Sequence, residues 1–360
     1  MKKILFIIPS LSNGGAEKVV SQISSGLCNE NYEVAVLVFF NHNNSYELND
    51  NIKLINLSNG YEEEYNRISK INRLKKIRKK IKEFNPDIII PFLDHICIYT
   101  YFSTVFSKYT KKIVFTERNN PKFLNKKLVK VKKILQYLFI KKIIVQNHGQ
   151  FECLPKKVQN KTYIISNPIS FKYLVYEKEL NDIPIHLISI GRLLDQKDYP
   201  LAINAFNNVL KKYPNLIYHI YGKGEDKDKI EKLIKELNLE GKVKLEGFTT
   251  DINKVYENAD IYLMTSKFEG MPNALAESMA VGIPSISIDC EFGPSDLIDN
   301  ENMGILVKEH TIEAVEKALL YMIENYNIYS FKSKYVKERM KERYSLDKIT
   351  NEWIKVIEDI

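Results

Sequence analysis

Residues 261–284 have the sequence IYLMTSKFEGMPNALAESMAVGIP, which predicts a strand, a tight turn and a helix in immediate succession. The apolar run Ile261–Met264 is typical of a buried strand, and Pro272 suits the first position of the helix that follows. Open α/β folds bind ligands at the carboxyl ends of such strands. Two carboxylates, Glu269 and Glu277, flank the turn with seven residues between them. We therefore expect the carboxylates and the amides at the helix start to bind a nucleotide sugar.

Short apolar strands alternate with helical patterns along the whole chain. In the first half the predicted strands are 4–8, 34–38, 52–57, 87–90, 113–115, 143–145 and 163–165. In the second half they are 186–190, 218–221, 243–245, 261–264, 285–288 and 305–307. The predicted helices include 66–84, 122–142 and a helical tail from about 311 to 360. This alternation predicts an α/β protein with two parallel sheets flanked by helices.

The length of the chain predicts two domains. At 360 residues the chain exceeds one ordinary domain, and each half is long enough to bury its own core. Asn167-Pro168 lies between the two strand–helix series and is the best linker candidate. We therefore expect an N-terminal domain of residues 1–168 and a C-terminal domain of residues 169–339.

Charge is distributed unevenly between these halves. Residues 1–168 carry 28 lysines and arginines against 13 acidic residues, a net charge of +15, whereas residues 169–360 carry 25 against 32, a net charge of −7. The basic half is expected to meet an anionic partner. Nucleic acid is not expected to be that partner, because no nucleic-acid recognition motif accompanies the charge.

Neither a disulfide framework nor a targeting segment is expected. Cys28, Cys97, Cys153 and Cys290 show no metal-ligand spacing and are typical of core cysteines in a reducing cytoplasm. The apolar run 4–8 is too short for a signal peptide. No run approaches the roughly 18 apolar residues of a membrane span.

A basic loop follows the first strand of the second half. Gly191 lets the backbone pass close to a ligand, while Arg192 and Lys197 place two cations where a diphosphate would lie. A solvated basic loop is the alternative. The presence of the pair Glu269 and Glu277 in the same half of the chain favours a binding site over a solvated loop.

Together, these motifs resemble glycosyltransferase family 4, whose members are retaining enzymes of the GT-B fold, with two Rossmann-like domains facing across a cleft. From about 186 to 307 the similarity rests on Gly191-Arg192…Lys197, Gly222-Lys223-Gly224, Gly247-Phe248, the E-x₇-E pair Glu269 and Glu277, and Gly293-Pro294. In the first half it rests on Gly14-Gly15-Ala16-Glu17 and on Thr116-Glu117-Arg118-Asn119. The latter is similar to a Ser-Glu-Arg-Asn segment of bacterial polysaccharide-assembly members.

The resemblance implies a role for each matching residue. Arg192 and Lys197 would bind the donor diphosphate, Glu277 would bind the ribose hydroxyls, and Glu269 would lie near the donor sugar. The other residues that match donor-binding positions are Gly14, Gly15, Gly191, Gly247, Phe248, Gly270, Met271, Pro272 and Asn273. The last helix, about 340–360 with Trp353, would cross back to the N-terminal domain, as in relatives.

No metal and no cofactor are expected. Two fixed cations and helix-end amides can neutralise the charge of a departing nucleoside diphosphate in place of a metal. Asp226 and Asp228 have the D-x-D spacing of metal-dependent sugar transferases of a different fold. Acidic residues are, however, common at a helix N-terminus such as the one expected here.

Three residues of the first half are candidates for the acceptor side. His95 follows the strand 87–90, and Glu117 and Arg118 follow the strand 113–115, so all three lie where a Rossmann-like domain places functional residues. A structural or cleft-lining histidine is the alternative for His95, and a local ion pair is the alternative for Glu117 and Arg118.

Two basic helices predict contact with a membrane. Residues 66–82 contain nine lysines and arginines, residues 122–142 contain eight lysines, and neither segment contains an acid. Unbalanced cations on amphipathic helices are attracted to an anionic lipid surface. The alternative is that the apolar faces pack on the sheet and the lysines are solvated.

The sequence therefore predicts a metal-independent, retaining enzyme. It would transfer a hexose or N-acetylhexosamine from a nucleotide sugar, expected to be UDP-linked, to a saccharide acceptor, expected to be lipid-linked. The expected location is the inner face of the cell membrane, in the assembly of a bacterial surface polysaccharide. A UDP-sugar epimerase of similar fold and a non-catalytic membrane-docking scaffold are the alternatives.

Overall fold

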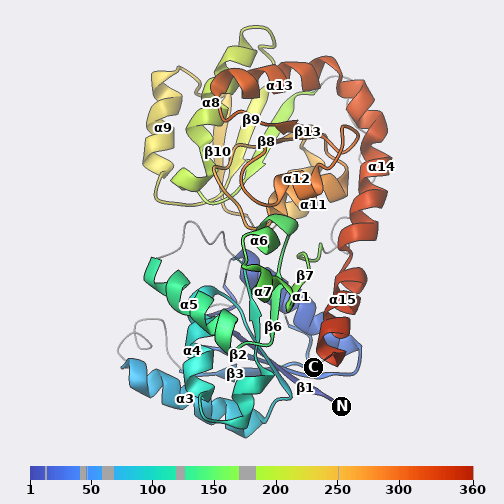
Figure 1. The fold of residues 1–360 in the computed structure, drawn as a ribbon. Helices are drawn as coiled ribbons and strands as arrows, with labels where there is room; N and C mark the ends of the chain where they lie inside the picture. Colours follow the sequence, from blue (N-terminus) through green and yellow to red (C-terminus); the bar gives the residue numbers. More distant parts are fainter. Residues whose placement is uncertain are drawn as a thin grey trace. The chain divides into compact units, whose positions relative to one another are not determined.

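The computed structural model describes residues 1–12, 14–40, 46, 48–58, 69–118, 126–169, 184–249 and 251–359, with the backbone alone at 126–129, 133 and 137. The chain divides into two compact units (Figure 1). The first unit is Met1–Pro168 together with Leu346–Ile360, and the second is Ile169–Ser345. The division near the C-terminus thus lies at 345/346 instead of the expected position near 340, because helix α14 (Tyr326–Tyr344) continues to Tyr344.

Within its described residues, the first unit contains seven parallel strands. They are β1 (Lys3–Ile8), β2 (Glu33–Val38), β3 (Lys53–Asn56), β4 (Ile88–Pro91), β5 (Val114–Thr116), β6 (Lys142–Val145) and β7 (Thr162–Ile164). The strand order is β3-β2-β1-β4 and β5-β6-β7, and a parallel bridge between Ile89 and Ile113 joins β4 to β5. The direction of the winding reverses between β1 and β4, which is where doubly wound sheets bind ligands.

Helices cover this sheet. They are α1 (Gly15–Asn29), α3 (Lys70–Phe84), α4 (Asp94–Thr104), α5 (Lys126–Leu138), α6 (His148–Glu152), α7 (Lys156–Gln159) and α15 (Leu346–Glu358), with the 3₁₀ turn η1 (Lys108–Lys112) after α4. The C-terminal helix α15 packs beside α1 (Figure 1). Its Trp353 is 1% exposed and contacts the rings of Phe6 and Phe92. The end of the chain therefore completes the core of the first unit.

The two basic helices differ from their predicted bounds. Helix α3 begins at Lys70, where the Ser69 side chain accepts a hydrogen bond from Asn72 N, and residues 66–68 of the prediction lie outside the described residues. Helix α5 ends at Leu138, and Lys142 of the predicted helix is the first residue of β6. The helix is therefore shorter than predicted, and the last residue of the predicted range belongs to a strand of the buried sheet.

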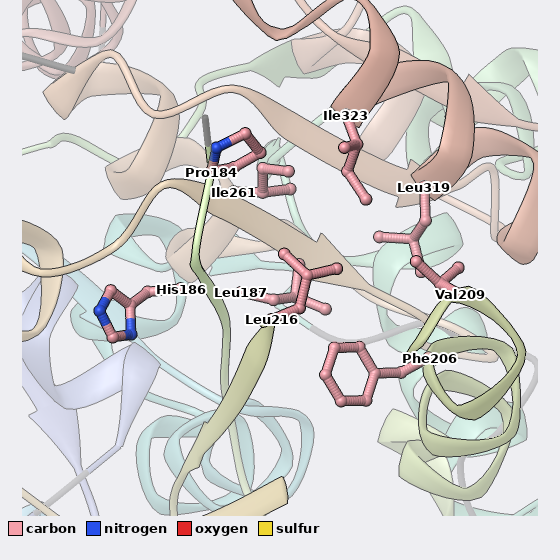
Figure 2. A pocket seen from close by; sticks show the side chains of 9 residues that line it. All are labelled: Pro184, His186, Leu187, Phe206, Val209, Leu216, Ile261, Leu319 and Ile323. Atoms are coloured by element: carbon pink, nitrogen blue, oxygen red, sulfur yellow. The ribbon is translucent and has the colours of Figure 1, made fainter. Parts of the chain in front are cut away.

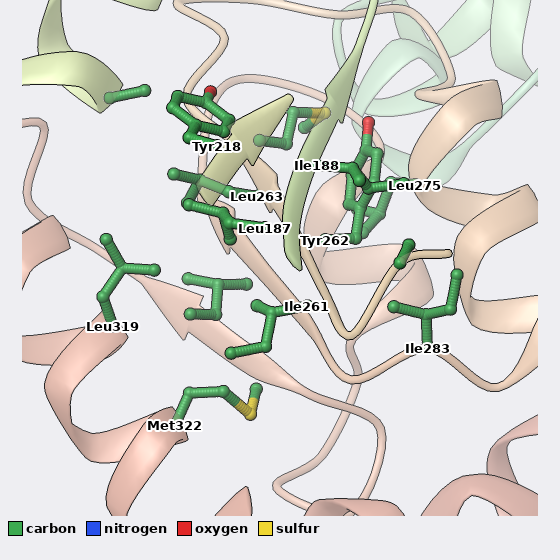
Figure 3. Close-up of a cluster of buried hydrophobic side chains, with 14 of the residues drawn as sticks. Leu187, Ile188, Tyr218, Ile261, Tyr262, Leu263, Leu275, Ile283, Leu319 and Met322 are labelled. Atoms are coloured by element: carbon green, nitrogen blue, oxygen red, sulfur yellow. The ribbon is translucent and has the colours of Figure 1, made fainter. Parts of the chain in front are cut away.

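The second unit contains a six-stranded parallel sheet of order β10-β9-β8-β11-β12-β13. The strands are β8 (His186–Ile190), β9 (Ile217–Tyr221), β10 (Val243–Gly247), β11 (Ile261–Met264), β12 (Ser285–Ile288) and β13 (Ile305–Val307). The helices are α8 (Tyr199–Leu210), α9 (Lys227–Glu236), α10 (Ile252–Glu257), α11 (Asn273–Val281), α12 (Pro294–Leu297), α13 (Ile312–Glu324) and α14, with the 3₁₀ turn η4 (Asp195–Lys197). Figure 3 shows the apolar side chains that fill the space between this sheet and its helices.

A small apolar cavity lies within the core of the second unit (Figure 2). It is lined by side chains of β8, α8, β11 and α13, among them Leu187, Phe206, Ile261 and Leu319. With about 10 Å³ it has room for one water molecule at most. The cavity is a packing defect of the core and too small for a sugar.

Candidate active site

Glu269 lies in the turn between β11 and α11. Its side chain is buried and its Oε1 accepts a hydrogen bond from Lys197 Nζ at 2.6 Å, which forms an ion pair. The backbone of the turn is held from the other side, because Glu269 N donates to the carbonyl of Glu291 at 3.3 Å. The structure thus pairs two residues for which the resemblance implies separate roles.

The loop after β8 is tied to the loop after β11 by hydrogen bonds. Gln196 Nε2 donates to the carbonyl of Phe268 at 2.8 Å, and Lys267 N donates to the carbonyl of Gln196 at 2.8 Å. Thr265 Oγ1 donates to the carbonyl of Lys197 at 3.0 Å. Since β8 and β11 are parallel neighbours in the sheet, their following loops emerge at the same edge. This arrangement sets the position of the Lys197–Glu269 pair.

The loops after β8 and β9 approach so closely that they require glycine. A Cβ atom at Gly222 would lie 1.8 Å from the carbonyl oxygen of Gly191. The hydroxyl of Tyr199, the first residue of α8, donates to the same carbonyl at 3.0 Å. Arg192, next in the chain, is exposed. The expected cationic loop therefore has a fixed backbone and an arginine in contact with solvent.

Glu277 lies in α11, about one turn after the start of the helix at Asn273. Tyr256, a buried residue of α10, donates its hydroxyl to Glu277 Oε2 at 3.3 Å. Burial raises the pKa of the Tyr256 hydroxyl well above its usual value, with the Glu277 carboxylate as a further cause. The hydroxyl therefore stays protonated and holds one oxygen of Glu277.

The start of α11 is shaped by a neighbouring loop. No side chain caps this helix, whose N-cap position is Pro272. Gly293 (φ 100°) packs behind it, since a Cβ atom there would lie 2.5 Å from Pro272 Cδ. At the end of β10, Gly247 adopts φ 75° and the next residue, Phe248, is 43% exposed. Lys223, which lies in the loop after β9, has its Nζ 5.5 Å from the ring centroid of Phe248.

In the first unit, Gly14 and Gly15 begin helix α1, which is the first helix after β1. Gly14 is the N-cap residue and α1 starts at Gly15. A Cβ atom at Gly14 would lie 2.0 Å from Glu17 Oε2, so the carboxylate of Glu17 folds back over the glycine. That carboxylate is placed as in a capping box, in which a residue of the first turn reaches back to the N-cap.

Glu117, a candidate for contact with the acceptor, is buried and paired inside the protein. It is 4% exposed, and its Oε1 accepts a hydrogen bond from Lys132 Nζ at 2.8 Å. Lys132 also ion-pairs with Asp94, the first residue of α4. Burial raises the pKa of Glu117 against the opposing effect of Lys132. Burial disfavours the Lys132 ammonium, but the carboxylates of Glu117 and Asp94 outweigh this and raise the pKa of Lys132.

Arg118 and His95 occupy different surroundings at the same edge of the sheet. Arg118 is buried and donates from Nη1 to Asn167 Oδ1 at 2.9 Å, so its partner is not its neighbour Glu117. His95 is exposed in the first turn of α4, and desolvation lowers its pKa against the opposing charge of Asp94. Leu93, just before α4, has φ 76°, a strained conformation of the kind that gathers at functional sites.

Comparison with known proteins shows the family. Residues 176–342 match the model of the glycosyl transferases group 1 domain. An uncharacterized glycosyltransferase of Methanocaldococcus jannaschii is 30% identical over 345 residues, covering 80% of this chain and 83% of that protein. This chain belongs to the glycosyltransferases.

Two further proteins are similar to this glycosyltransferase over residues 1–360, one in sequence and one in fold. A Campylobacter jejuni α-1,4-N-acetyl-D-galactosaminyltransferase, whose name gives a diphospho-undecaprenol-linked saccharide as its acceptor, is 27% identical and covers 100% of this chain and 99% of that protein. The HepE structure from Anabaena, solved with UDP and glucose, superimposes with a TM-score of 0.83 at 16% identity and covers 100% of both chains. The expected α/β class and GT-B fold are thereby confirmed.

Sequence patterns did not reveal three residues around these sites of the glycosyltransferase. Tyr256 has no motif that links it to Glu277. Asp94, next to His95, belongs to no motif either. Lys132 could have been recognised from its spacing. It lies four residues after Leu128 and three before Leu135, so it shares the predicted apolar face of its helix with these leucines, where a solvated lysine is not expected. A lysine on an apolar stripe predicts a buried partner.

Proposed function

We propose that this glycosyltransferase is a family 4 enzyme that transfers a hexose or N-acetylhexosamine from a nucleotide sugar to a saccharide acceptor with retention. The observation that carries the proposal is the Lys197–Glu269 ion pair, held between the loops after β8 and β11. It stands beside the exposed Arg192 and the start of α11. Cations, a carboxylate and a helix N-terminus are the groups that a diphosphate sugar requires.

In this proposal, different residues of the second unit bind different parts of the donor. Arg192 and Lys197 bind the diphosphate and stabilise the negative charge that develops when it leaves. Glu269 orients Lys197 and accepts hydrogen bonds from the sugar hydroxyls. Glu277, with one oxygen held by Tyr256, accepts from the ribose hydroxyls. Gly247 and Phe248 line the base pocket.

UDP as the nucleotide and retention as the stereochemical course are supported by the relatives. HepE was solved with UDP and glucose. The name of the Campylobacter enzyme gives an α product. Because common UDP-hexoses carry an α-linked diphosphate, an α product corresponds to retention.

We further propose that the acceptor is lipid-linked and is met at the inner face of the cell membrane. None of the helices in the described ranges is long and apolar enough to span a bilayer. The first unit does, however, present exposed apolar side chains on and around α4 and α5: Phe102, Phe106, Val131, Ile134, Leu138 and Phe139. We call these six residues the apolar patch. Exposed apolar side chains that gather on neighbouring elements are typical of interaction sites.

Charge around the apolar patch fits an anionic lipid surface. Between residues 95 and 151 the sequence contains a single acidic residue, Glu117, and that residue is buried. Lys108, Lys111, Lys130 and Lys141 of the same segment are exposed. Apolar groups among unbalanced lysines are the composition of an interfacial anchor. The patch thus adds a hydrophobic component to the lysine-based membrane contact that the sequence predicted.

The test is transfer activity with a panel of nucleotide sugars, with and without lipid-linked acceptors. A UDP-sugar should be turned over only with an acceptor, and Arg192→Ala or Lys197→Ala should lower kcat/KM by about 10²-fold or more. Lys232→Ala, which removes an exposed cation of α9, is the matched control and should have a small effect. Near-normal kcat/KM in both donor-loop variants contradicts the proposal, and turnover without acceptor favours an epimerase.

The same assay tests metal independence. We propose that the two cations do the work of a metal, so activity should persist in excess EDTA. Complete loss that Mn²⁺ or Mg²⁺ restores would instead indicate a metal site, with Asp226 and Asp228 as the first candidates.

A further inference from the structure

Arg118 has hydrogen-bond donors that the protein does not use. Its guanidinium lies at the carboxyl end of β5, 4.5 Å from the ring centroid of Phe92 and 5.7 Å from that of Trp353. The side chain is 7% exposed, and Nη1 donates to Asn167 Oδ1. Nε and Nη2 are buried and have no hydrogen-bond partner in the described part of the chain. The same is true of the indole nitrogen of Trp353.

The unpaired atoms of Arg118 form one edge of the guanidinium. The Nε–H bond and one Nη2–H bond are parallel, and this edge binds the two oxygens of a carboxylate or phosphate in a bidentate way. The opposite side, Nη1, is held by Asn167, whose Oδ1 also accepts from Gln146 Nε2 at 2.9 Å. The guanidinium is therefore oriented by protein contacts that leave its bidentate edge without an acceptor among the described residues.

The neighbouring carboxylate does not neutralise this charge by direct contact. Glu117 lies next to Arg118 in the chain, but its two oxygens accept from Lys132 Nζ and from Gln136 Nε2. Burial lowers the pKa of Arg118 to about 9, so the guanidinium is still charged at neutral pH, and a buried charge without a paired anion destabilises a fold. Polar groups left unpaired in this way call for a functional explanation, such as a ligand that completes them.

We propose that the bidentate edge of Arg118 binds an oxyanion of the acceptor substrate, a phosphate or a carboxylate. The inference rests on the proposed function and names the chemistry of the acceptor's charged group. The position supports it, since β5 adjoins β4 at the carboxyl edge of the sheet, beside the switch point between β1 and β4. The strained turn at Leu93 and the exposed His95 lie at the end of β4.

The test uses full-length protein carrying Arg192→Ala, so that anions bound at the proposed donor loop contribute little. Melting temperature is measured with increasing inorganic pyrophosphate or malonate, at an ionic strength held constant with KCl. The parent should be stabilised by one of the two anions, and the anion that acts identifies phosphate or carboxylate as the ligand class. Adding Arg118→Met should raise the melting temperature without ligand, because the unpaired charge is removed, and should abolish the shift caused by the anion.

Two further variants keep the test decisive. Lys111→Met, which removes an exposed charge of the same unit, should respond to the anion as the parent does. Arg118→Lys keeps the charge but loses the bidentate edge, so its affinity for the anion should fall at least tenfold, and it serves if Arg118→Met does not fold. An unchanged response in the Arg118 variants, or no response in the parent, overturns the site.

Kinetics then separate this site from the proposed function. With an active Arg192 and a charged acceptor, Arg118→Lys should raise KM for the acceptor at least tenfold while KM for the donor stays within twofold. If Arg192→Ala abolishes transfer but Arg118→Lys leaves both KM values unchanged, the donor assignment stands and the acceptor site does not.

Discussion

Lys132 shows how one buried charge organises the first unit. Its ammonium ion-pairs with Glu117 and Asp94, and all three side chains are almost inaccessible to water. Buried ion pairs add little net stability while intact, but removing one partner leaves an uncompensated charge. The three residues connect the start of α4, the end of β5 and the middle of α5. The ion pairs thereby fix the strand end from which Arg118 projects.

At the residue scale we predict that the partners of this cluster differ in their tolerance. Lys132→Met should lower the free energy of unfolding by about 3–5 kcal/mol, because Asp94 and Glu117 lose their counterion. Glu117→Gln should cost much less, since it resembles the protonated acid that burial favours and Gln can still accept from Lys132. Chemical denaturation of both variants checks this order, and equal losses would contradict it.

The pH dependence of stability provides a second measurement on Glu117. Its pKa is raised in the folded protein, so the folded state holds a proton that the unfolded state releases. The resulting stabilisation is complete below the unfolded pKa and is lost as pH rises through the folded pKa. The stability of the wild type relative to Glu117→Gln should therefore fall as pH increases above about 4.5. A difference between the two proteins that does not fall with increasing pH would show that folding does not raise the pKa of Glu117.

At the scale of the elements, function depends most on the rigidity of the loops that follow the parallel strands. The loops after β8 and β9 touch through Gly191 and Gly222, and no other residue fits at the second position. We predict that Gly222→Ala displaces the Gly191-Arg192 backbone and lowers kcat/KM at least tenfold. Gly241→Ala is the matched control for positive φ, because φ is 82° there and no atom lies within 4 Å of the added Cβ. Activity assays should show the loss only for Gly222→Ala.

Helices α4 and α5 carry the membrane contact proposed for this protein. Binding to anionic liposomes should weaken as salt shortens the screening length to about 3 Å at 1 M, because the lysines contribute about 1 kcal/mol each. Lys130→Glu with Lys141→Glu should remove most of this salt-sensitive part. Phe106→Ser with Leu138→Ser should remove the binding that remains at high salt.

The matched control for the apolar variants lies on the second unit. Phe331 of α14 is 90% exposed and lies outside the apolar patch, so Phe331→Ser should leave co-sedimentation with liposomes unchanged. Equal binding to anionic and neutral vesicles, or full binding by both double variants, would show that the lysines and the apolar patch are only a solvated surface.

For the whole molecule, the two units have separate cores. Every buried apolar residue in the core of the second unit lies between Ile169 and Tyr344, whereas the cores of the first unit include Trp353 and its neighbours on α15. We predict that Trp353→Ala costs about 3–5 kcal/mol and lowers the melting temperature of the first unit alone. Calorimetry should resolve two transitions of which one moves, and binding of a nucleoside diphosphate should persist. A parallel shift of both transitions would contradict separate cores.

The sequence alone determined the features that depend on neighbours along the chain. Strands such as β8, β11, β12 and β13 were predicted with their bounds, because a short apolar run between turn residues is a local signal. The glycine loops and the two glutamates of the second unit were found for the same reason. Helix ends were predicted less well, as for α5, since β6 competes for the same residues through contacts made elsewhere in the fold.

Only the tertiary structure decided which side chains meet. Lys197 and Glu269 lie far apart in the sequence, and they form a pair because β8 and β11 are neighbours in a sheet whose order differs from the order of the chain. In the sequence, Lys132 is one of several lysines of a basic helix. Only the packing of α5 on α4 places it between two carboxylates. The unpaired edge of Arg118 likewise exists only in three dimensions, because satisfaction of a hydrogen-bond donor depends on every atom around it and not on the spacing of residues along the chain.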